Sequence, residues 1–296
     1  QSIGPELEKR IQIIIDTGLI ELNDDFKIYW NNFPIAKLSV GNDYLNPSFE
    51  LIIDDTIDQN PKQKLIDFIS KWIQTKINTI LKSLIDLKNL KEKNSSIKAL
   101  AYQLYENNGV LKREQVSEYL KSLGQNERKI LRDLGVKFGR YHVFLYQLIK
   151  PEAVSLRTLL WKNFHQKYHK LKPPTFGLNF LDDQESRNRN FMLLCGFEKF
   201  ENLFVRIDIL ERLFMQIINS NSKENKEIKM VPEMLNLLGC SKDNFKKLLK
   251  KMGYKIFDKE EETFFKYSPL KQFKKNPVKK VSSENPFKIL KNLNLG

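Results

Sequence analysis

The chain has 296 residues, of which 41% are hydrophobic and 29% charged, with a formal net charge of +14. This length allows about two or three compact units, and the apolar content excludes a chain that is disordered throughout. No apolar run reaches the ~18 residues that a membrane-spanning helix needs, and the sequence does not open on a signal peptide. Its two cysteines, Cys195 and Cys240, form neither a disulfide framework nor a CxxC pair, so we expect a protein of the reducing cytoplasm. Because the first residue is Gln rather than Met, we also expect a fragment or a processed chain.

Charge is distributed unevenly along the chain. Residues 1–60 carry 4 Lys and Arg against 11 Asp and Glu, a net of −7, and the remainder carries a net of +21. A positive field of this size attracts polyanions, and counterion release from a phosphate backbone supplies salt-sensitive affinity. The alternative is compositional, because Lys, Asn and Ile are abundant in AT-rich genomes and surface lysines keep a protein soluble. That alternative does not explain why acidic residues concentrate in residues 1–60, which we call the acidic head, so the charge favours a nucleic-acid partner.

The first 60 residues predict a short helix followed by a small antiparallel β meander. The helix covers 6–16 and ends near Gly18. Three β-prone runs follow at 26–30, 35–40 and 49–53, and Asn-, Gly- and Pro-rich turns separate them. We therefore expect residues 1–60 to form one unit.

Residues 61–220 predict a helical domain. Apolar residues from Leu65 to Ile85 recur every three or four positions, which predicts one amphipathic helix from Pro61 to about Leu90. Glycines at helix ends and Pro151 at a helix start delimit further helices. The predicted helices are 97–107, 112–123, 126–134, 151–168, 184–194 and 207–219, with a short hairpin at 196–206.

Residues 226–267 have the element order of a winged helix-turn-helix unit. Helices at 231–238 and 242–252 flank a short turn that ends on Ser241, a typical N-cap residue. Two β-prone runs follow across an acidic turn. From Ser268 onward seven lysines accompany one acid and three prolines, so we predict that 268–296 is a flexible basic tail. The expected fold class is mainly α (α+β): a helical bundle with an N-terminal antiparallel β meander and a C-terminal winged-helix-like unit.

Motifs for catalysis are missing from the sequence. It contains no Gly-Lys-Ser/Thr tripeptide of a P-loop, no GxSxG elbow and no GxGxxG fingerprint. His165 and His169 have the spacing of the HExxH zinc motif, but Gln166 stands where the general base belongs and no third ligand follows. A solvated or phosphate-facing surface is therefore favoured over a metal site. We expect no catalytic residue, no metal and no cofactor in this chain.

Two basic clusters are candidates for nucleic-acid binding. The stronger surrounds helix 242–252, where an apolar stripe lies opposite a lysine-rich face that can contact phosphates. Lysines without arginines favour non-specific phosphate contact over base reading. The second cluster, within 137–150, mixes cations with aromatic residues that can stack on unpaired bases or belong to the core. With the tail, the candidate residues are Lys242, Lys246, Lys247, Lys250, Lys251, Lys255, Lys137, Arg140, Tyr141, His142, Lys150, Lys274, Lys275, Lys279 and Lys280.

Three blocks of sequence resemble the C-terminal region of alphaproteobacterial superfamily II (DEAD/DEAH-type) helicases similar to the mitochondrial degradosome RNA helicase. The first is LGVKFGRYHVFL at 134–145, continued by LIKP at 148–151 and LRTLLW at 156–161. The others lie within 196–213 and 232–254, so the resemblance spans most of 20–257. It departs at Tyr146, where such sequences tend to have proline, which makes the local turn uncertain.

The resemblance implies a parent ATP-dependent helicase whose motor domains precede this chain. ATP and Mg would then be cofactors of the parent, with none in this chain, and the partners would be RNA or DNA and the motor domains, with no membrane. The expected function is an accessory nucleic-acid-binding region that holds RNA or DNA for the motor. One alternative is a protein-interaction scaffold that docks a helicase motor or a nuclease partner. The other is a stand-alone enzyme, which the missing motifs disfavour.

Overall fold

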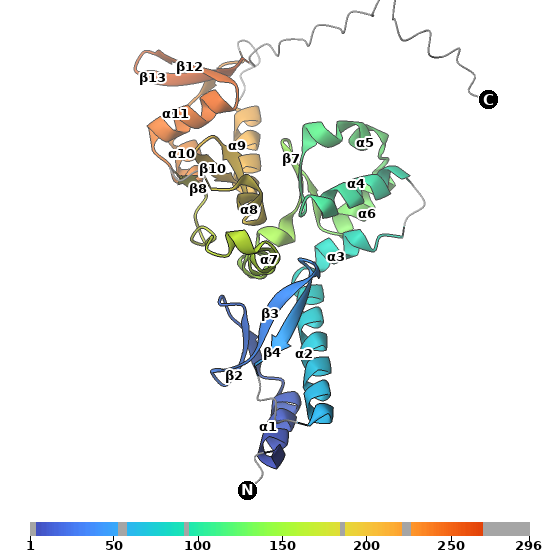
Figure 1. Cartoon of the computed structure of the whole chain (residues 1–296). Helices are drawn as coiled ribbons and strands as arrows, with labels where there is room; N and C mark the ends of the chain where they lie inside the picture. The colour runs from blue at the N-terminus through green and yellow to red at the C-terminus, as the bar shows by residue number, and fades with distance from the viewer. Residues whose placement is uncertain (1–3, 53–57, 92–94, 184–186, 221–225, 269–296) are drawn as a thin grey trace, which may run out of the picture.

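The computed structural model describes residues 4–52, 58–91, 95–183, 187–220 and 226–268. The described part of the chain combines helices with four small antiparallel sheets, so the predicted mixed α+β class is confirmed. Figure 1 shows the N-terminal elements at one end of the molecule, with two groups of elements above them on either side. Among these residues, no helix is both long enough and apolar enough to cross a membrane.

The N-terminal region is a helix followed by the predicted β meander. Helix α1 (Gly4–Thr17) leads into a four-stranded sheet whose strands follow chain order. The strands are β1 (Ile20–Leu22), β2 (Lys27–Trp30), β3 (Phe33–Asp43) and β4 (Asn46–Leu51). All of their pairings are antiparallel, which confirms the meander and adds β1 to it.

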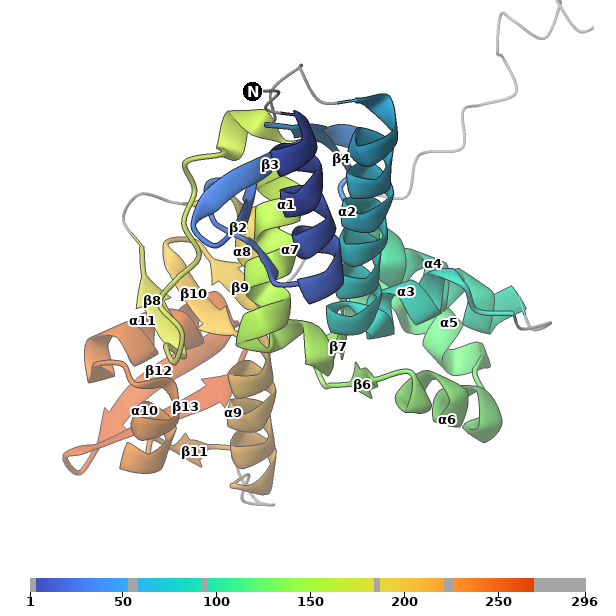
Figure 2. The same ribbon diagram turned by 90° about the horizontal axis from the view of Figure 1, so that it is seen from below.

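The predicted long helix is broken in two. Helix α2 (Gln59–Ile80) ends where Leu81 leaves the helical conformation, with φ −103° and ψ 24°, and α3 (Lys82–Lys88) follows. Helix α2 packs against α1 and α7, and α7 packs against β3 and β4 (Figure 2). The stripe of apolar residues that predicted a single helix continues through the break because Leu81 is itself fully buried.

After α3, the described chain repeats one arrangement three times. In each unit a helix precedes a strand, a later helix comes directly before a β hairpin, and the sheet has the order first, third, second strand. The first unit comprises α4 (Ser95–Glu106), β5 (Val110–Lys112), η1 (Arg113–Val116), α5 (Ser117–Ser122), α6 (Gln125–Asp133), β6 (Val136–Phe138) and β7 (His142–Leu145). The second comprises η2 (Tyr146–Ile149), α7 (Pro151–Phe164), η3 (Gln166–Tyr168), β8 (Phe180–Asp182), α8 (Arg189–Leu194), β9 (Phe197–Phe200) and β10 (Leu203–Arg206). The third comprises α9 (Ile207–Asn219), β11 (Ile228–Lys229), α10 (Pro232–Leu238), α11 (Lys242–Lys251), β12 (Tyr254–Lys259) and β13 (Glu262–Tyr267).

A glycine occupies the same place in each unit, between the helix and the hairpin. Gly135, Gly196 and Gly253 have φ of +92°, +84° and +89°. This conformation suits glycine, and it turns the chain from the end of the helix into the first hairpin strand. Each glycine carbonyl also accepts a hydrogen bond from the residue that follows the hairpin, at distances of 3.4, 2.8 and 2.9 Å. The repeat is thus built from the same backbone contacts each time.

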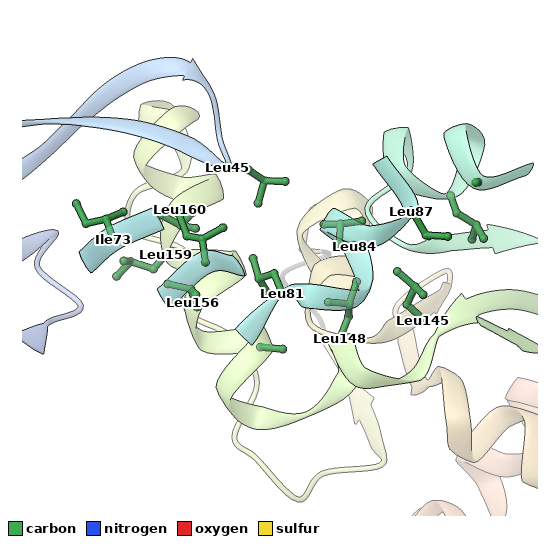
Figure 3. Close-up of a cluster of buried hydrophobic side chains, with 14 of the residues drawn as sticks. Leu45, Ile73, Leu81, Leu84, Leu87, Leu145, Leu148, Leu156, Leu159 and Leu160 are labelled. Carbon is green, nitrogen blue, oxygen red and sulfur yellow. The ribbon is translucent and has the colours of Figure 1, made fainter. Parts of the chain in front are cut away.

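The largest hydrophobic core joins the N-terminal region to the first unit. It runs from Leu45 beside the meander through Ile73 and Leu81 to Leu145, with Leu156 of α7 packed between them (Figure 3). A second cluster joins α9 to the rest of the third unit, where Phe245 and Phe265 are fully buried. Side chains of α9 therefore belong to the same core as the 226–267 segment.

Several predicted elements differ in the structure. The range 61–220, predicted to be a helical domain, also holds β5 to β10 in two sheets. Within it, the predicted helix 112–123 is replaced by the end of β5, η1 and the short α5. Strands β9 and β10 confirm the hairpin predicted at 196–206. The other four strands were missed because they are three or four residues long and β7 is buried at every position, so no alternation marks it. The predicted helices 97–107, 126–134, 207–219, 231–238 and 242–252 are confirmed by α4, α6, α9, α10 and α11.

Candidate functional site

Helix α11 presents the predicted lysine face opposite a buried stripe. Phe245, Leu248 and Leu249 are completely buried, and the Ser241 hydroxyl caps the helix by accepting from the Asn244 backbone N–H at 3.2 Å. Residues three and four positions apart are neighbours on a helix surface, so the lysines form adjacent rows. The exposed lysines are Lys242, Lys247, Lys250 and Lys251, joined by Lys255 on β12.

Two of these lysines also make ion pairs. The Lys246 ammonium, which is half-buried, lies 3.7 Å from Asp258, and Lys251 pairs with Glu201 of the β9–β10 turn. Exposed pairs of this kind contribute little stability and are screened by salt. They leave the face positive, because the lysines of α11 outnumber these acids.

The turn between β6 and β7 is held by a carboxylate from α9. Both oxygens of Glu211 take part, accepting the backbone N–H groups of Arg140, Tyr141 and His142 at 2.5, 2.9 and 2.9 Å. A Cβ on Gly139 would lie 2.6 and 2.7 Å from these oxygens, so only glycine allows the approach. This turn of the first unit is thereby fixed against the third.

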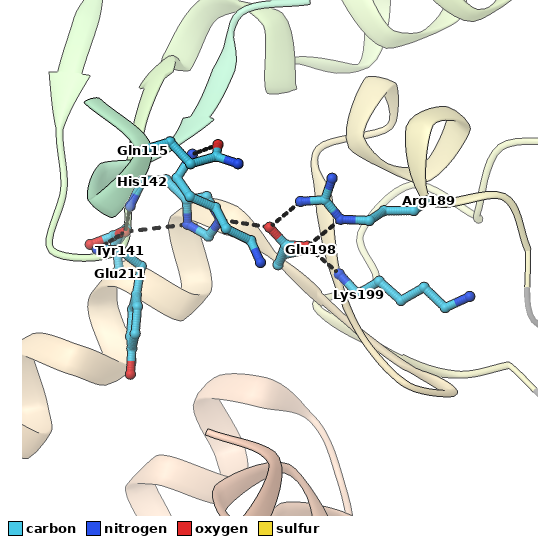
Figure 4. A network of polar contacts seen from close by, with 8 residues as sticks. Gln115, Tyr141, His142, Arg189, Glu198, Lys199 and Glu211 are labelled. Carbon is cyan, nitrogen blue, oxygen red and sulfur yellow. Dashed lines mark hydrogen bonds and ion pairs between the residues drawn. The ribbon is translucent and has the colours of Figure 1, made fainter. Parts of the chain in front are cut away.

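His142 lies where the three units meet, as Figure 4 shows. A hydrogen bond of 2.9 Å joins its Nε2 to Glu198 of β9, and its Nδ1 lies 3.6 Å from Glu211. Burial by itself would lower the pKa of His142, but the hydrogen bond to Glu198 and the nearby charge of Glu211 raise it above its ordinary value. Burial likewise opposes ionisation of both glutamates, yet the adjacent His142 imidazole and hydrogen bonds from backbone N–H groups hold their pKa values below the usual range.

This network corrects one predicted binding residue. His142 is only 2% exposed, and Glu198 also accepts two hydrogen bonds of 3.1 Å from Arg189. The imidazole is therefore mainly a structural link between units, and only a small part of it lines the groove described next. Tyr141 is half-buried, with its ring edge-on to Phe214 at a centroid distance of 3.9 Å.

A groove of about 620 Å³ opens beside this junction. Cations from all three units line it, together with Glu114 and the already paired Glu198. The Arg113 guanidinium is positioned by donating to the Gly139 carbonyl at 2.7 Å. Since the cations outnumber the acids, the groove favours an anionic occupant. We name this cavity the basic groove. Its lining cations are Lys112, Arg113, Arg140, Lys199 and Lys251.

The structure brings together only part of the predicted site. The groove is lined by Arg140, Tyr141, Lys251 and the small exposed part of His142. Lys137 on β6 and Lys150 before α7 are exposed elsewhere. The predicted tail lysines, Lys274, Lys275, Lys279 and Lys280, lie outside the described residues.

Three cations of the groove were missed from the sequence. Lys112, Arg113 and Lys199 come from short elements that carry no lysine-rich pattern. The repeated position of the glycines Gly135, Gly196 and Gly253 was a usable signal, because it aligns the three hairpins.

The His165 and His169 pair does not form a metal site. Helix α7 ends at Phe164, so the two residues do not share a helix as the HExxH zinc motif requires. The His165 ring packs against Trp161 with centroids 4.5 Å apart, and His169 Nδ1 bonds to the Gln166 carbonyl. Within the described ranges, no three His, Cys, Asp or Glu side chains are grouped so that they could hold a metal ion.

Comparison of the chain with protein-family models, with curated proteins and with solved structures finds no match.

Proposed function

We propose that this chain is an accessory nucleic-acid-binding region of an ATP-dependent superfamily II helicase, built from three winged-helix units in tandem. The element order and the first-third-second strand order of each unit support the winged-helix assignment. In such folds the helix before the hairpin is the one that approaches the nucleic acid. That helix is α11 in the third unit.

The observation that carries the proposal is the lysine face of α11 next to the basic groove. Lys251 belongs to both, so a nucleic acid whose phosphates contact α11 can run on into the groove without a break in positive charge. Lysines contact phosphates as point charges and do not discriminate bases, so we expect affinity without strong sequence preference.

The helicase part of the proposal rests on the three blocks of sequence resemblance. The role that it assigns to this chain is to hold RNA or DNA for motor domains that bind ATP and Mg. No step of ATP hydrolysis is assigned to residues of this chain.

Binding of fluorescein-labelled nucleic acid, followed by anisotropy over a range of salt concentrations, tests the proposal. We expect binding to the full chain at low salt, with an affinity that falls steeply as salt rises, because each neutralised phosphate adds about 0.7 to 0.9 to the logarithmic slope. The Lys247→Glu/Lys250→Glu variant should bind more weakly and with a shallower slope.

Lys64→Glu/Lys71→Glu is the matched control. It changes the net charge equally, but on the exposed side of α2 at the other end of the molecule (Figure 1). If both variants lose the same amount of affinity, the loss reflects net charge and not the lysine face of α11. Absence of binding by the unmodified chain at low salt would refute the proposal.

One observation favours the scaffold alternative for the N-terminal region. Leu19 and Phe33 are 70% and 68% exposed on the acidic head, and large apolar side chains at a surface suit a protein partner. Retention of the parent's motor domains on the immobilised chain, lost on Leu19→Ser/Phe33→Ser substitution but unchanged in Lys247→Glu/Lys250→Glu, would favour this role for the head.

A further inference from the structure

A second hollow, of about 480 Å³, adjoins the same Arg140–Tyr141 turn. Helix α9 forms one wall and the sheet of the third unit forms the other. Arg140 and Tyr141 line both this hollow and the basic groove, so the two are neighbours. Its other lining residues include Phe214, Tyr254 and Tyr267, and we name it the aromatic hollow.

The aromatic side chains of this hollow differ in how firmly they are held. Tyr141 packs edge-on against Phe214, and the neighbouring Tyr254 is only 6% exposed. These rings form a fixed wall. Tyr267 contacts Tyr254 at a centroid distance of 5.3 Å but is itself 58% exposed, so much of its ring is open to a ligand.

Charge complementarity indicates the chemical class of the occupant. Two cations, Arg140 and Lys226, stand among the aromatic and aliphatic residues of the hollow, and no acid is among its lining residues in the described part of the chain. A ligand that is flat and apolar on its faces and anionic along its backbone matches this combination. A nucleobase joined to phosphates has both properties.

The hollow suits an unpaired strand better than a duplex. In a duplex the faces of the bases are covered by stacking, so an aromatic ring can reach them only in unpaired segments. A hollow of this volume lies in the range of small-molecule sites and can take one base out of the stack. The adjoining basic groove then provides cations for the neighbouring phosphates.

We propose that the aromatic hollow binds an unstacked base of a single strand, with Tyr267 as the stacking platform and the neighbouring phosphates in the basic groove. This inference rests on the proposed function, and it names the strand type that the lysine face of α11 does not distinguish. Tyr141 is a positioning residue here, because its packing against Phe214 shapes the wall.

The test uses the full chain and a thymidine single strand that carries one 2-aminopurine, whose fluorescence is quenched by stacking. Affinities for this strand and for a duplex of the same length are measured for Tyr267→Ala, Tyr267→Trp and the control Tyr102→Ala. Tyr102 is 61% exposed on α4 and lines neither hollow.

We expect Tyr267→Ala to weaken single-strand binding by roughly 5- to 150-fold, as removal of one stacking ring does, and to abolish the quenching. Tyr267→Trp should preserve both, and duplex binding should not change. Equal losses for single strand and duplex, or an effect no larger than that of Tyr102→Ala, would overturn the inference. So would an unquenched probe on a strand that the unmodified chain binds.

The two proposals fail differently. If the unmodified chain binds neither strand nor duplex, the proposed function fails and this inference fails with it. If both are bound, with losses in Lys247→Glu/Lys250→Glu but none in Tyr267→Ala, only the base site is refuted, and the hollow would suit an apolar protein segment instead.

Discussion

Arg157 on α7 provides the sharpest test of how the first two units are joined. Among the described residues it is the largest side chain that is completely buried. Its guanidinium donates to the carbonyls of Asn108, Leu148 and Leu194 at 2.6, 3.2 and 2.6 Å. These carbonyls lie at or just beyond the C-terminal ends of α4, η2 and α8, where helix dipoles favour a cation.

We expect Arg157→Met to destabilise the chain by about 3–5 kcal/mol. Methionine fills a similar volume, so the cost comes from the lost bonds and not from a cavity. Hydrogen bonds to a charged group contribute roughly 1.5–3 kcal/mol each, and each carbonyl left buried without a donor costs about 1–3 kcal/mol. Removing the charge also removes its own burial penalty, which offsets part of that loss.

Urea unfolding monitored by circular dichroism measures the change. The stability of Arg157→Lys should lie between that of Arg157→Met and that of the unmodified chain, because an ammonium lacks the planar fork that reaches several carbonyls. The exposed Arg212 on α9 supplies the matched control, and Arg212→Met should stay within about 0.5 kcal/mol of the unmodified chain. An equally small effect of Arg157→Met would refute the reasoning.

Three further predictions concern the junction and α11. The pKa of His142 is raised in the fold, so the stability that the protonated imidazole contributes is present below the ordinary pKa of about 6.5 and is lost as the pH rises through the folded pKa. The difference in unfolding free energy between the unmodified chain and His142→Phe should therefore shrink when urea titrations move from about pH 6 to pH 9. A constant difference would contradict this. Gly139→Ala should cost about 1–3 kcal/mol in the same assay, and less when Glu211→Ala removes the clash. Ser241→Ala should lower stability by about 1 kcal/mol through loss of the α11 cap, and Ser241→Asn should restore it.

The sequence determined the elements that carry a local periodic signal. The apolar stripe of α11 and its N-cap at Ser241 depend only on residues within one helix, and the structure confirms both. The N-terminal meander was also predicted, because its β-prone runs alternate with turns of Asn, Gly and Pro. The uneven distribution of charge along the chain is likewise visible in the sequence alone.

Tertiary structure decided the sheet of the first unit, the strands β8 and β11 that complete the other two sheets, and the basic groove. Strands of three or four residues such as β7 are buried at every position, so they carry no alternation. Arg157 lies in an otherwise apolar run of sequence, and its partners are backbone carbonyls, which every residue possesses. The groove depends on Glu211 reaching backbone N–H groups about 70 positions away. Backbone donors and acceptors leave no trace in the amino-acid sequence, so contacts made through them become visible only when the chain is folded.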